Sequence, residues 1–269
     1  MSEKLLWLVY RKLRPALGIP FAFVLMSGAF LGVINFQIII FAFGLFFIDL
    51  FGNFYNDYCD FAEDIRNKRK DKFTTCGVMG QKTTLHISIG MVITGFLILL
   101  NTHTPFLLFG ILLAFLLFAY SHKALRLKGK LFGYAMSFPY FILPLLIAFV
   151  FDIHTKNALA LGLFFYLQCL YILCQKDSTD TKDDSNLFLS KGWNLSFKIT
   201  TFFAILSNVL LLYLSTTNTI LLLAWILNTF AKVSNLKHIM FRTITRKQRS
   251  NYILTEFLSH YMFIVCVLI

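Results

Sequence analysis

Long apolar runs separated by short polar stretches occupy almost the whole sequence of 269 residues. A hydrocarbon layer about 30 Å thick is crossed by roughly 20 helical residues, and at that length the runs predict nine transmembrane helices. The expected spans are residues 15–33, 36–55, 84–101, 105–121, 131–151, 157–175, 196–214, 218–235 and 252–269. The pattern therefore predicts an all-α, multi-pass membrane helical bundle.

Composition supports a membrane protein. The chain is 58% apolar, contains 32 phenylalanines and is only 14% charged, which is far from the average of soluble domains. No polar connection is long enough for a second domain, so we expect one membrane-embedded domain over residues 1–269. Pro139 and Pro144 fall inside the expected span 131–151, where we expect each of them to kink the helix.

The net charge of +12 is distributed unevenly along the chain. Lys156 lies between the fifth and sixth expected spans. The other 24 of the 25 Lys and Arg residues lie near the N-terminus, or in or beside the connections after spans two, four, six and eight. Cytoplasmic connections of membrane proteins are enriched in Lys and Arg, so the N-terminus and these connections are predicted to be cytoplasmic. This topology explains the charge, and nucleic-acid binding is not expected.

Two acidic motifs of identical spacing stand directly after apolar runs. They consist of Asp57, Asp60 and Asp64, and of Asp177, Asp180 and Asp184. On a helix, this spacing places three carboxylates within about 60° of one another, so each motif presents one acidic stripe. Such carboxylates repel unless a cation lies among them, and Mg²⁺ prefers carboxylate, water and phosphate oxygens. The motifs predict Mg²⁺ sites that bind a diphosphate; a solvated acidic loop is the alternative. No Cys or His spacing favours zinc.

A polar stripe is expected to continue from the first motif into the membrane. Asp49, Asn53, Asn56 and Asp57 follow the i, i+4, i+7, i+8 spacing of one helical face, and the stripe descends about 12 Å. An intramembrane carboxylate is a candidate functional group. Asp49 could serve as a general base or as the negative partner of a developing cation, and a structural hydrogen bond to a neighbouring helix is an equally open interpretation.

Basic and hydroxyl side chains near the motifs are candidates to bind diphosphate oxygens. They are Lys68 and Lys72 after the first motif, Lys176 before the second, and Tyr120, Arg126 and Lys128 in the connection after span four. Positive groups there could stabilise a departing diphosphate. A role in membrane topology is the competing interpretation for most of them.

These residues resemble the motifs of the UbiA superfamily of intramembrane prenyltransferases. Asn56 to Asp64 match the family's N-D-x-x-D-x-x-x-D motif, and Asp177 to Asp184 match its D-x-x-D-x-x-x-D motif. The resemblance extends to Lys176, to the stretch from Tyr120 to Lys128, and to Arg14-Pro15, so that it covers nearly the whole chain.

One segment departs from the family pattern. Many members follow the first motif with N-K-P-x-R-P, whereas this chain reads Asn67-Lys68-Arg69-Lys70-Asp71-Lys72. The usual arginine is missing, and Lys70 or Lys72 is the candidate to replace it. Lysine provides a point charge and lacks the bidentate fork of arginine.

The resemblance implies an activity. It implies a nine-helix bundle that uses Mg²⁺ to bind an isoprenyl diphosphate and transfers the prenyl group to a lipophilic, aromatic acceptor in the bilayer. An intramembrane terpene cyclase of the same fold, which needs no acceptor, is the alternative. A cation channel or transporter is a third hypothesis, but few acidic residues fall inside the expected spans. The acceptor, the prenyl chain length and the oligomeric state stay open.

Overall fold

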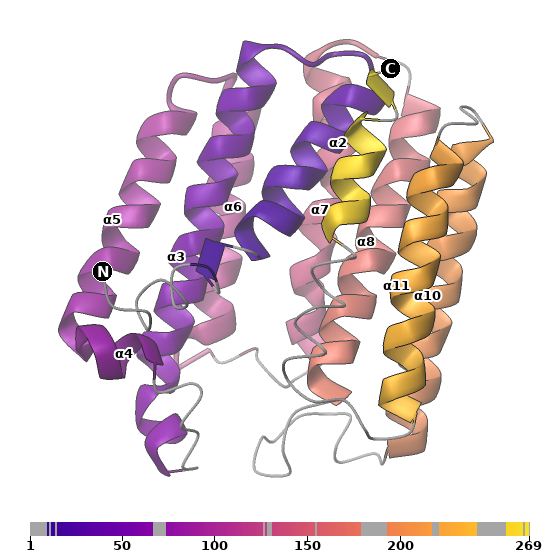
Figure 1. The fold of residues 1–269 in the computed structure, drawn as a ribbon. Helices are drawn as coiled ribbons and strands as arrows, with labels where there is room; N and C mark the ends of the chain where they lie inside the picture. The colour runs from indigo at the N-terminus through magenta and orange to yellow at the C-terminus, as the bar shows by residue number, and fades with distance from the viewer. Residues whose placement is uncertain are drawn as a thin grey trace. The chain divides into compact units, whose positions relative to one another are not determined.

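The protein is described by a computed structural model, in which every regular element is a helix within the described residues (Figure 1). Those residues are 10, 12–13, 15–66, 74–125, 127, 131–153, 155–178, 193–216, 221–240, 257–265 and 267–268. Five helices there are long and apolar enough to cross a membrane: Phe36–Ala62, Gln81–Leu99, Thr104–Ser121, Lys156–Cys174 and Phe197–Ser215. Shorter apolar helices cover Leu17–Phe30, Tyr134–Val150 and Leu221–Ser234. The all-helical architecture is confirmed, and the count of nine crossings stays a prediction.

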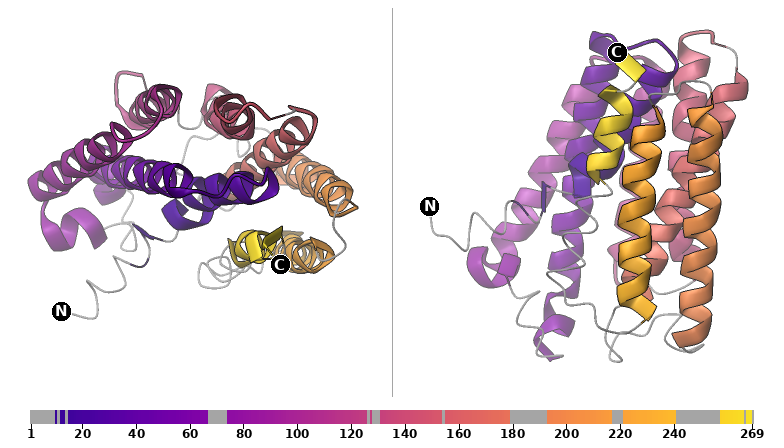
Figure 2. Two further views of the ribbon diagram at one scale, coloured as in Figure 1. Left: turned by 90° about the horizontal axis from the view of Figure 1, so that it is seen from above. Right: turned by 45° about the vertical axis from the view of Figure 1, so that its right-hand side comes forward.

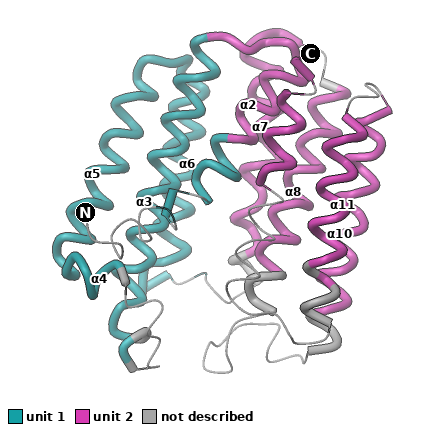
Figure 3. The backbone as a smooth tube through the Cα atoms, viewed as in Figure 1, with its two compact units in different colours: residues 1–21, 36–128 teal, residues 22–35, 129–269 magenta. Residues whose placement is uncertain are grey.

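The chain forms two compact units, which Figure 3 shows in different colours. Unit 1 comprises Met1–Phe21 and Phe36–Lys128, and unit 2 comprises Ala22–Asn35 and Gly129–Ile269. Each unit therefore combines a short N-terminal piece with a longer, later segment. The expectation of a single domain over residues 1–269 stays a prediction.

The central element of unit 1 is α3 (Phe36–Arg66), which contacts α5 (Gln81–Leu99) and α6 (Thr104–Ser121) (Figure 2). At 1.5 Å per residue its 31 residues extend about 46 Å, which exceeds the hydrocarbon thickness of about 30 Å. The span expected at 36–55 lies within α3, and the helix continues beyond it through the first motif. A short helix, α4 (Thr74–Met79), precedes α5.

Glycines allow α3 to approach α5 closely. A Cβ on Gly95 would lie 3.0 Å from the carbonyl oxygen of Gly44 and 2.9 Å from the Ile48 side chain. In membranes, small residues permit the backbone approach on which helix association depends. Aromatic packing adds to this core, because the rings of Phe41 and Phe106 stack at 4.1 Å.

Unit 2 is built around α8 (Thr155–Ser178), which contacts α7 (Phe138–Val150) and α10 (Trp193–Ser215). The helix α10 also contacts α11 (Leu221–Met240), and α2 (Ala22–Phe30) contacts α7 and α8. An aromatic cluster holds the core, since Phe23 stacks on Phe165 at 4.0 Å and meets the edge of Tyr140 at 5.7 Å.

The first expected span is not one continuous α-helix. It begins as a π-helix, η1 (Leu17–Phe21), which contains Pro20, and continues as α2. Proline has no N–H to donate, and this disturbs the regular i to i−4 ladder. Just after α2, Gly32 adopts a φ of 72° that favours glycine, and Val33 N–H donates to the Gly28 carbonyl at 2.8 Å.

The span expected at 131–151 is also divided. A 3₁₀ segment, η2 (Leu131–Ser137), leads into α7. Pro139 lies in the first turn of α7, where its N–H has no helical partner to lose, so the expected kink at Pro139 is wrong. Pro144 lies inside α7 as expected.

Large apolar side chains remain exposed on several helices. They include Ile93 and Leu97 on α5, Leu108 and Phe115 on α6, and Phe202, Ile205 and Val209 on α10. Exposed apolar faces of this extent suit contact with lipid chains rather than water. Together with the five membrane-length helices, they identify an integral membrane protein.

We predict that Gly162→Ala destabilises the protein. A Cβ at Gly162 of α8 would overlap the backbone carbonyl oxygen of Phe141 in α7, and backbone cannot move away as a flexible side chain can. Overpacking of this kind costs about 1–3 kcal/mol. Gly90→Ala on α5 is the matched control, because nothing lies within 4 Å of the added Cβ. Thermal unfolding in detergent should show a lower Tm for Gly162→Ala alone; equal Tm values would contradict the prediction.

Candidate active site

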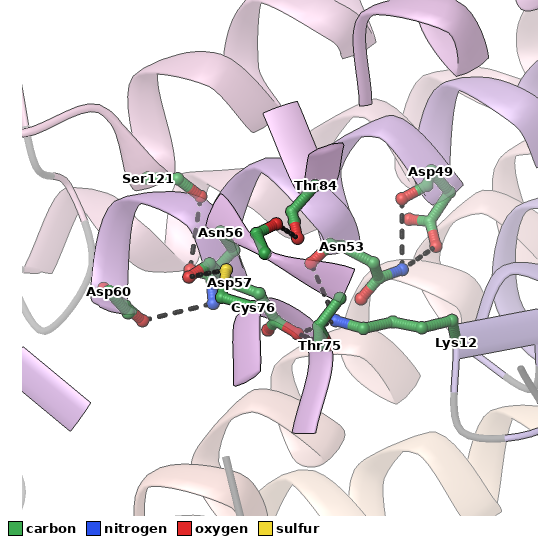
Figure 4. Close-up of polar contacts among 11 residues, drawn as sticks. Lys12, Asp49, Asn53, Asn56, Asp57, Asp60, Thr75, Cys76, Thr84 and Ser121 are labelled. Carbon is green, nitrogen blue, oxygen red and sulfur yellow. Dashed lines mark hydrogen bonds and ion pairs between the residues drawn. The ribbon is translucent and has the colours of Figure 1, made fainter. Parts of the chain in front are cut away.

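The first acidic motif lies on the last turns of α3, in unit 1. Asn56, Asp57 and Asp60 follow the apolar part of the helix and sit on a side that meets α4 and α6 (Figure 4). Asp60 is 7% exposed, so its carboxylate is buried although it lies near the end of a long helix. Asp57 and Asp60 are therefore part of a packed helix rather than of a solvated acidic loop.

Asp57 is held by side chains from two other segments. The Nζ of Lys12 lies 2.5 Å from Asp57 Oδ2, and the side chains are 7% and 14% exposed, respectively. The Thr75 hydroxyl of α4 donates a short hydrogen bond to the same oxygen. Cys76 Sγ donates to the backbone carbonyl of Asp57 at 3.6 Å. A positive charge is thus already stabilised at the first carboxylate of the motif.

Asn56 joins the motif to α6. Its Nδ2 donates to Asp60 Oδ2 at 3.2 Å, and its Oδ1 accepts from the Ser121 hydroxyl at 3.2 Å. The two bonds use the donor and the acceptor of the amide at once, which fixes its orientation. Asn56 thereby orients the carboxylate of Asp60.

The polar stripe expected along α3 is present. Asn53 Nδ2 donates to Asp49 Oδ2 at 2.8 Å and to the Asp49 carbonyl at 3.0 Å. Lys12 Nζ donates to the Asn53 carbonyl at 2.9 Å, so one ammonium contacts both the stripe and Asp57. Asn53 belongs to the same helix as Asp49, so a hydrogen bond from Asp49 to a neighbouring helix and a chemical role for Asp49 both stay predictions.

The second motif begins in unit 2, where Asp177 lies in the last turn of α8. Several expected site residues lie outside the described residues: Arg14, Lys68, Lys72, Arg126, Lys128, Asp180 and Asp184. The side chains of Asp64, Lys176 and Asp177 are also outside them, although their backbones are helical. Tyr120 is half-buried on α6, next to Ser121.

The oxygen donors at and near Asp57 are of the type that Mg²⁺ prefers. The described residues contain no cluster of three or more His, Cys, Asp or Glu side chains that could hold a metal. Asp57 and Asp60 nevertheless supply hard oxygen donors, and Asp57 already binds an ammonium. Mg²⁺ usually takes only one or two carboxylates, together with water and substrate phosphate. These two residues therefore fit the ion as part of a ligand set.

Sequence reasoning missed Lys12, Thr75 and Ser121. The first was counted only as one of the N-terminal basic residues, and the second lies in a segment expected to be a polar connection. Ser121 adjoins Tyr120, which was predicted as a candidate to bind diphosphate oxygens, but Ser121 itself was not predicted. No spacing rule connects residue 12 or 75 with residue 57, because these contacts arise only from tertiary packing.

Comparison with known proteins identifies the family. A family model described as the UbiA prenyltransferase family matches residues 18–263. The chain belongs to the UbiA prenyltransferase family. The motif resemblance is thereby confirmed, and the protein is a membrane prenyltransferase.

The fold of this UbiA chain also resembles a solved structure of digeranylgeranylglyceryl phosphate synthase. The TM-score is 0.60 at 20% sequence identity, and the match covers 99% of each chain. At that identity, the likeness shows the fold alone. No curated protein matches the sequence.

We predict that Lys12→Met destabilises the UbiA chain in magnesium-free detergent. The substitution leaves the largely buried Asp57 carboxylate without its ammonium, and breaking a buried pair costs about 3–5 kcal/mol. Asp57→Asn in the same chain should recover part of this loss, because the uncompensated charge is gone. Both effects are measured as free energies of unfolding.

Lys82→Met provides the matched control, since Lys82 belongs to the same unit but is exposed at the start of α5. A surface substitution of this type should stay within about 0.5 kcal/mol. If Lys12→Met and Lys82→Met are equally stable, the ion pair does not contribute as described.

Proposed function

We propose that the protein transfers the prenyl group of an isoprenyl diphosphate to a lipophilic acceptor, with Mg²⁺ bound at the acidic motifs. The observation that carries the proposal is the cation-binding carboxylate Asp57 at the end of a membrane-length helix, in a chain of this family. The prenyl tail is apolar and suits the hydrocarbon environment, whereas the diphosphate requires charged partners.

Asp57 and Asp60 would hold one Mg²⁺ together with Asp64, and the aspartates of the second motif would hold another. When bound, the metal supplies Lewis-acid neutralisation of the diphosphate charge. The ammonium of Lys12, which lies beside Asp57, can bind diphosphate oxygens. Asn56 keeps the Asp60 carboxylate oriented during turnover.

The reaction breaks the bond between the prenyl C1 and its diphosphate oxygen, and the bonding electrons leave with the diphosphate. The resulting allylic cation is attacked by a nucleophilic carbon or oxygen of the acceptor, and a base then takes the displaced proton. Asp49 is the candidate base or cation partner within the stripe of α3, with Asn53 fixing its carboxylate. Exclusion of water by the surrounding helices protects the cation from hydrolysis.

The basic flanks support a cytoplasmic position for both motifs. Arg66, Lys68, Arg69, Lys70 and Lys72 follow the first motif, and Lys176 adjoins Asp177 in sequence. Diphosphate substrates made in the cytoplasm would then reach the motifs without crossing the membrane.

We expect Asp57→Asn and Asp177→Asn each to reduce turnover by at least about a hundredfold, the cost of losing one group that stabilises developing charge. Purified variants are given radiolabelled farnesyl diphosphate, Mg²⁺ and a membrane lipid extract as the source of acceptor. Release of diphosphate and label in the lipid fraction are both measured. Asp152→Asn is the control, because Asp152 is an exposed carboxylate in a left-handed turn that asparagine also adopts.

Undiminished turnover in either motif variant would contradict the assignment. Omission of the lipid extract separates transfer from cyclisation. A transferase should then form no prenylated product, whereas a cyclase would still convert the diphosphate into a hydrocarbon or terpene alcohol.

A further inference from the structure

The hydroxyl of Thr75 is committed to the first acidic motif. Thr75 is the second residue of α4, is fully buried, and donates its hydrogen bond to Oδ2 of Asp57 on α3 (Figure 4). The next residue, Cys76, donates from its Sγ to the Asp57 backbone carbonyl at 3.6 Å. Two neighbouring side chains of α4 therefore contact the same residue of the motif, one at its carboxylate and one at its backbone.

Several other threonine hydroxyls of the protein bond in a different way. Thr84, Thr94 and Thr229 each donate to the carbonyl four residues earlier in the chain, which is a common arrangement for hydroxyls in helices. Thr75 instead donates to a carboxylate on another helix. A hydrogen bond to a charged group is stronger than one between neutral groups, so this hydroxyl can fix the orientation of the Asp57 carboxylate.

The donors that contact the Asp57 carboxylate all lie at one of its two oxygens. Lys12 Nζ lies 2.5 Å from Oδ2, and the Thr75 hydroxyl bonds the same atom. No described residue donates a hydrogen bond to Oδ1, and 14% of the Asp57 side chain is exposed. A carboxylate oxygen has two lone pairs, so the two donors occupy those of Oδ2 and leave Oδ1 for an incoming ligand.

The two donors at Oδ2 respond differently to a metal ion. The ammonium of Lys12 is positively charged and ends a flexible stem, so a divalent cation at Asp57 repels it. The Thr75 hydroxyl is neutral, and its β-branched side chain is stiff and fully buried. Thr75 can therefore keep its hydrogen bond to Oδ2 while a metal is bound, whereas the ammonium is pushed away.

Holding one carboxylate oxygen matters because Mg²⁺ and Ca²⁺ use carboxylates differently. Ca²⁺ takes roughly six to eight oxygen ligands in a flexible geometry and binds carboxylates through one oxygen or through both. Mg²⁺ requires a nearly ideal octahedron, whose neighbouring positions are about 90° apart, wider than the two oxygens of one carboxylate can span. A carboxylate that offers a single oxygen therefore suits Mg²⁺ and removes one way of binding Ca²⁺.

We propose that Thr75 is a positioning residue that makes Asp57 a one-oxygen ligand and thereby sets the preference of the site for Mg²⁺ over Ca²⁺. The inference rests on the proposed function, since it concerns the metal of that reaction. The hydroxyl holds Oδ2, so that Oδ1 alone is presented to the metal. Without the hydroxyl the carboxylate can turn and present both oxygens, which Ca²⁺ accepts and Mg²⁺ does not.

The test compares the two metals in the binding of farnesyl thiodiphosphate to the full chain in detergent. The concentrations of Mg²⁺ and of Ca²⁺ that give half-maximal binding are measured separately, and the wild-type protein should need less Mg²⁺ than Ca²⁺. Thr75→Val and Thr75→Ala both remove the hydroxyl and should each reduce this preference about tenfold, in line with the loss of one hydrogen bond to a charged group. Thr75→Ser keeps the hydroxyl and should retain most of the preference.

Thr84→Val is the matched control. Thr84 is also fully buried in unit 1, and its hydroxyl bonds the Gly80 carbonyl at 2.9 Å, to which its own N–H donates at 3.0 Å. This variant should keep the wild-type preference for Mg²⁺.

A purely structural role for Thr75 makes a different prediction. If the hydroxyl only held α4 against α3, its loss would lower the Tm and weaken binding with both metals by the same factor. Equal weakening, an unchanged preference in both Thr75→Val and Thr75→Ala, or a wild-type protein without preference for Mg²⁺ would overturn the proposal. If farnesyl thiodiphosphate shows no metal-dependent binding to the wild-type protein, the proposed function itself is refuted.

Discussion

A membrane supplies no hydrogen-bond partners, and this constraint governs both units of the protein. Helices satisfy most of the backbone, so a buried charge or amide has to find its partner within the protein. In unit 1 the solution is a connected network, in which Lys12 bridges Asp57 and the Asn53 carbonyl. Asn53 then holds Asp49. Removing one member leaves its neighbour unpaired where water cannot easily compensate.

Each unit contains a buried lysine, and the two ammonium groups have different surroundings. In unit 1, the carboxylate of Asp57 neutralises Lys12. In unit 2, a hydroxyl and a ring face orient Lys232.

Much of the fold could be predicted from the sequence, because the length of an apolar run is set by bilayer thickness. The helices α5, α6, α8 and α10 begin and end close to the expected limits. The predictions differ from the structure at prolines, whose effect depends on their exact position in the helix. Pro20 lies within a π-helical turn of the first span, and Pro139 lies in the first turn of α7, where it removes no helical hydrogen bond.

The part of the candidate site that lies on α3, the aspartates together with Asn53 and Asn56, was predictable from the sequence. Motif spacing identifies Asp57 and Asp60, since one helix carries both. Lys12 and Lys232 were counted among residues that set topology, because sequence cannot distinguish a lysine that faces water from one that folds back into the helices.

The position of Lys12 has a consequence for ligand binding. Its Nζ and the Thr75 hydroxyl share a single oxygen, Oδ2 of Asp57. Any cation that binds this oxygen competes with the ammonium, so its affinity is lowered by the free energy of the existing ion pair. The displaced ammonium then lies beside a bound cation, and the two positive charges repel each other. An anion that binds both of them removes this repulsion. If the proposed Mg²⁺ binds at Asp57, it would therefore bind more tightly together with a phosphate-bearing ligand than alone.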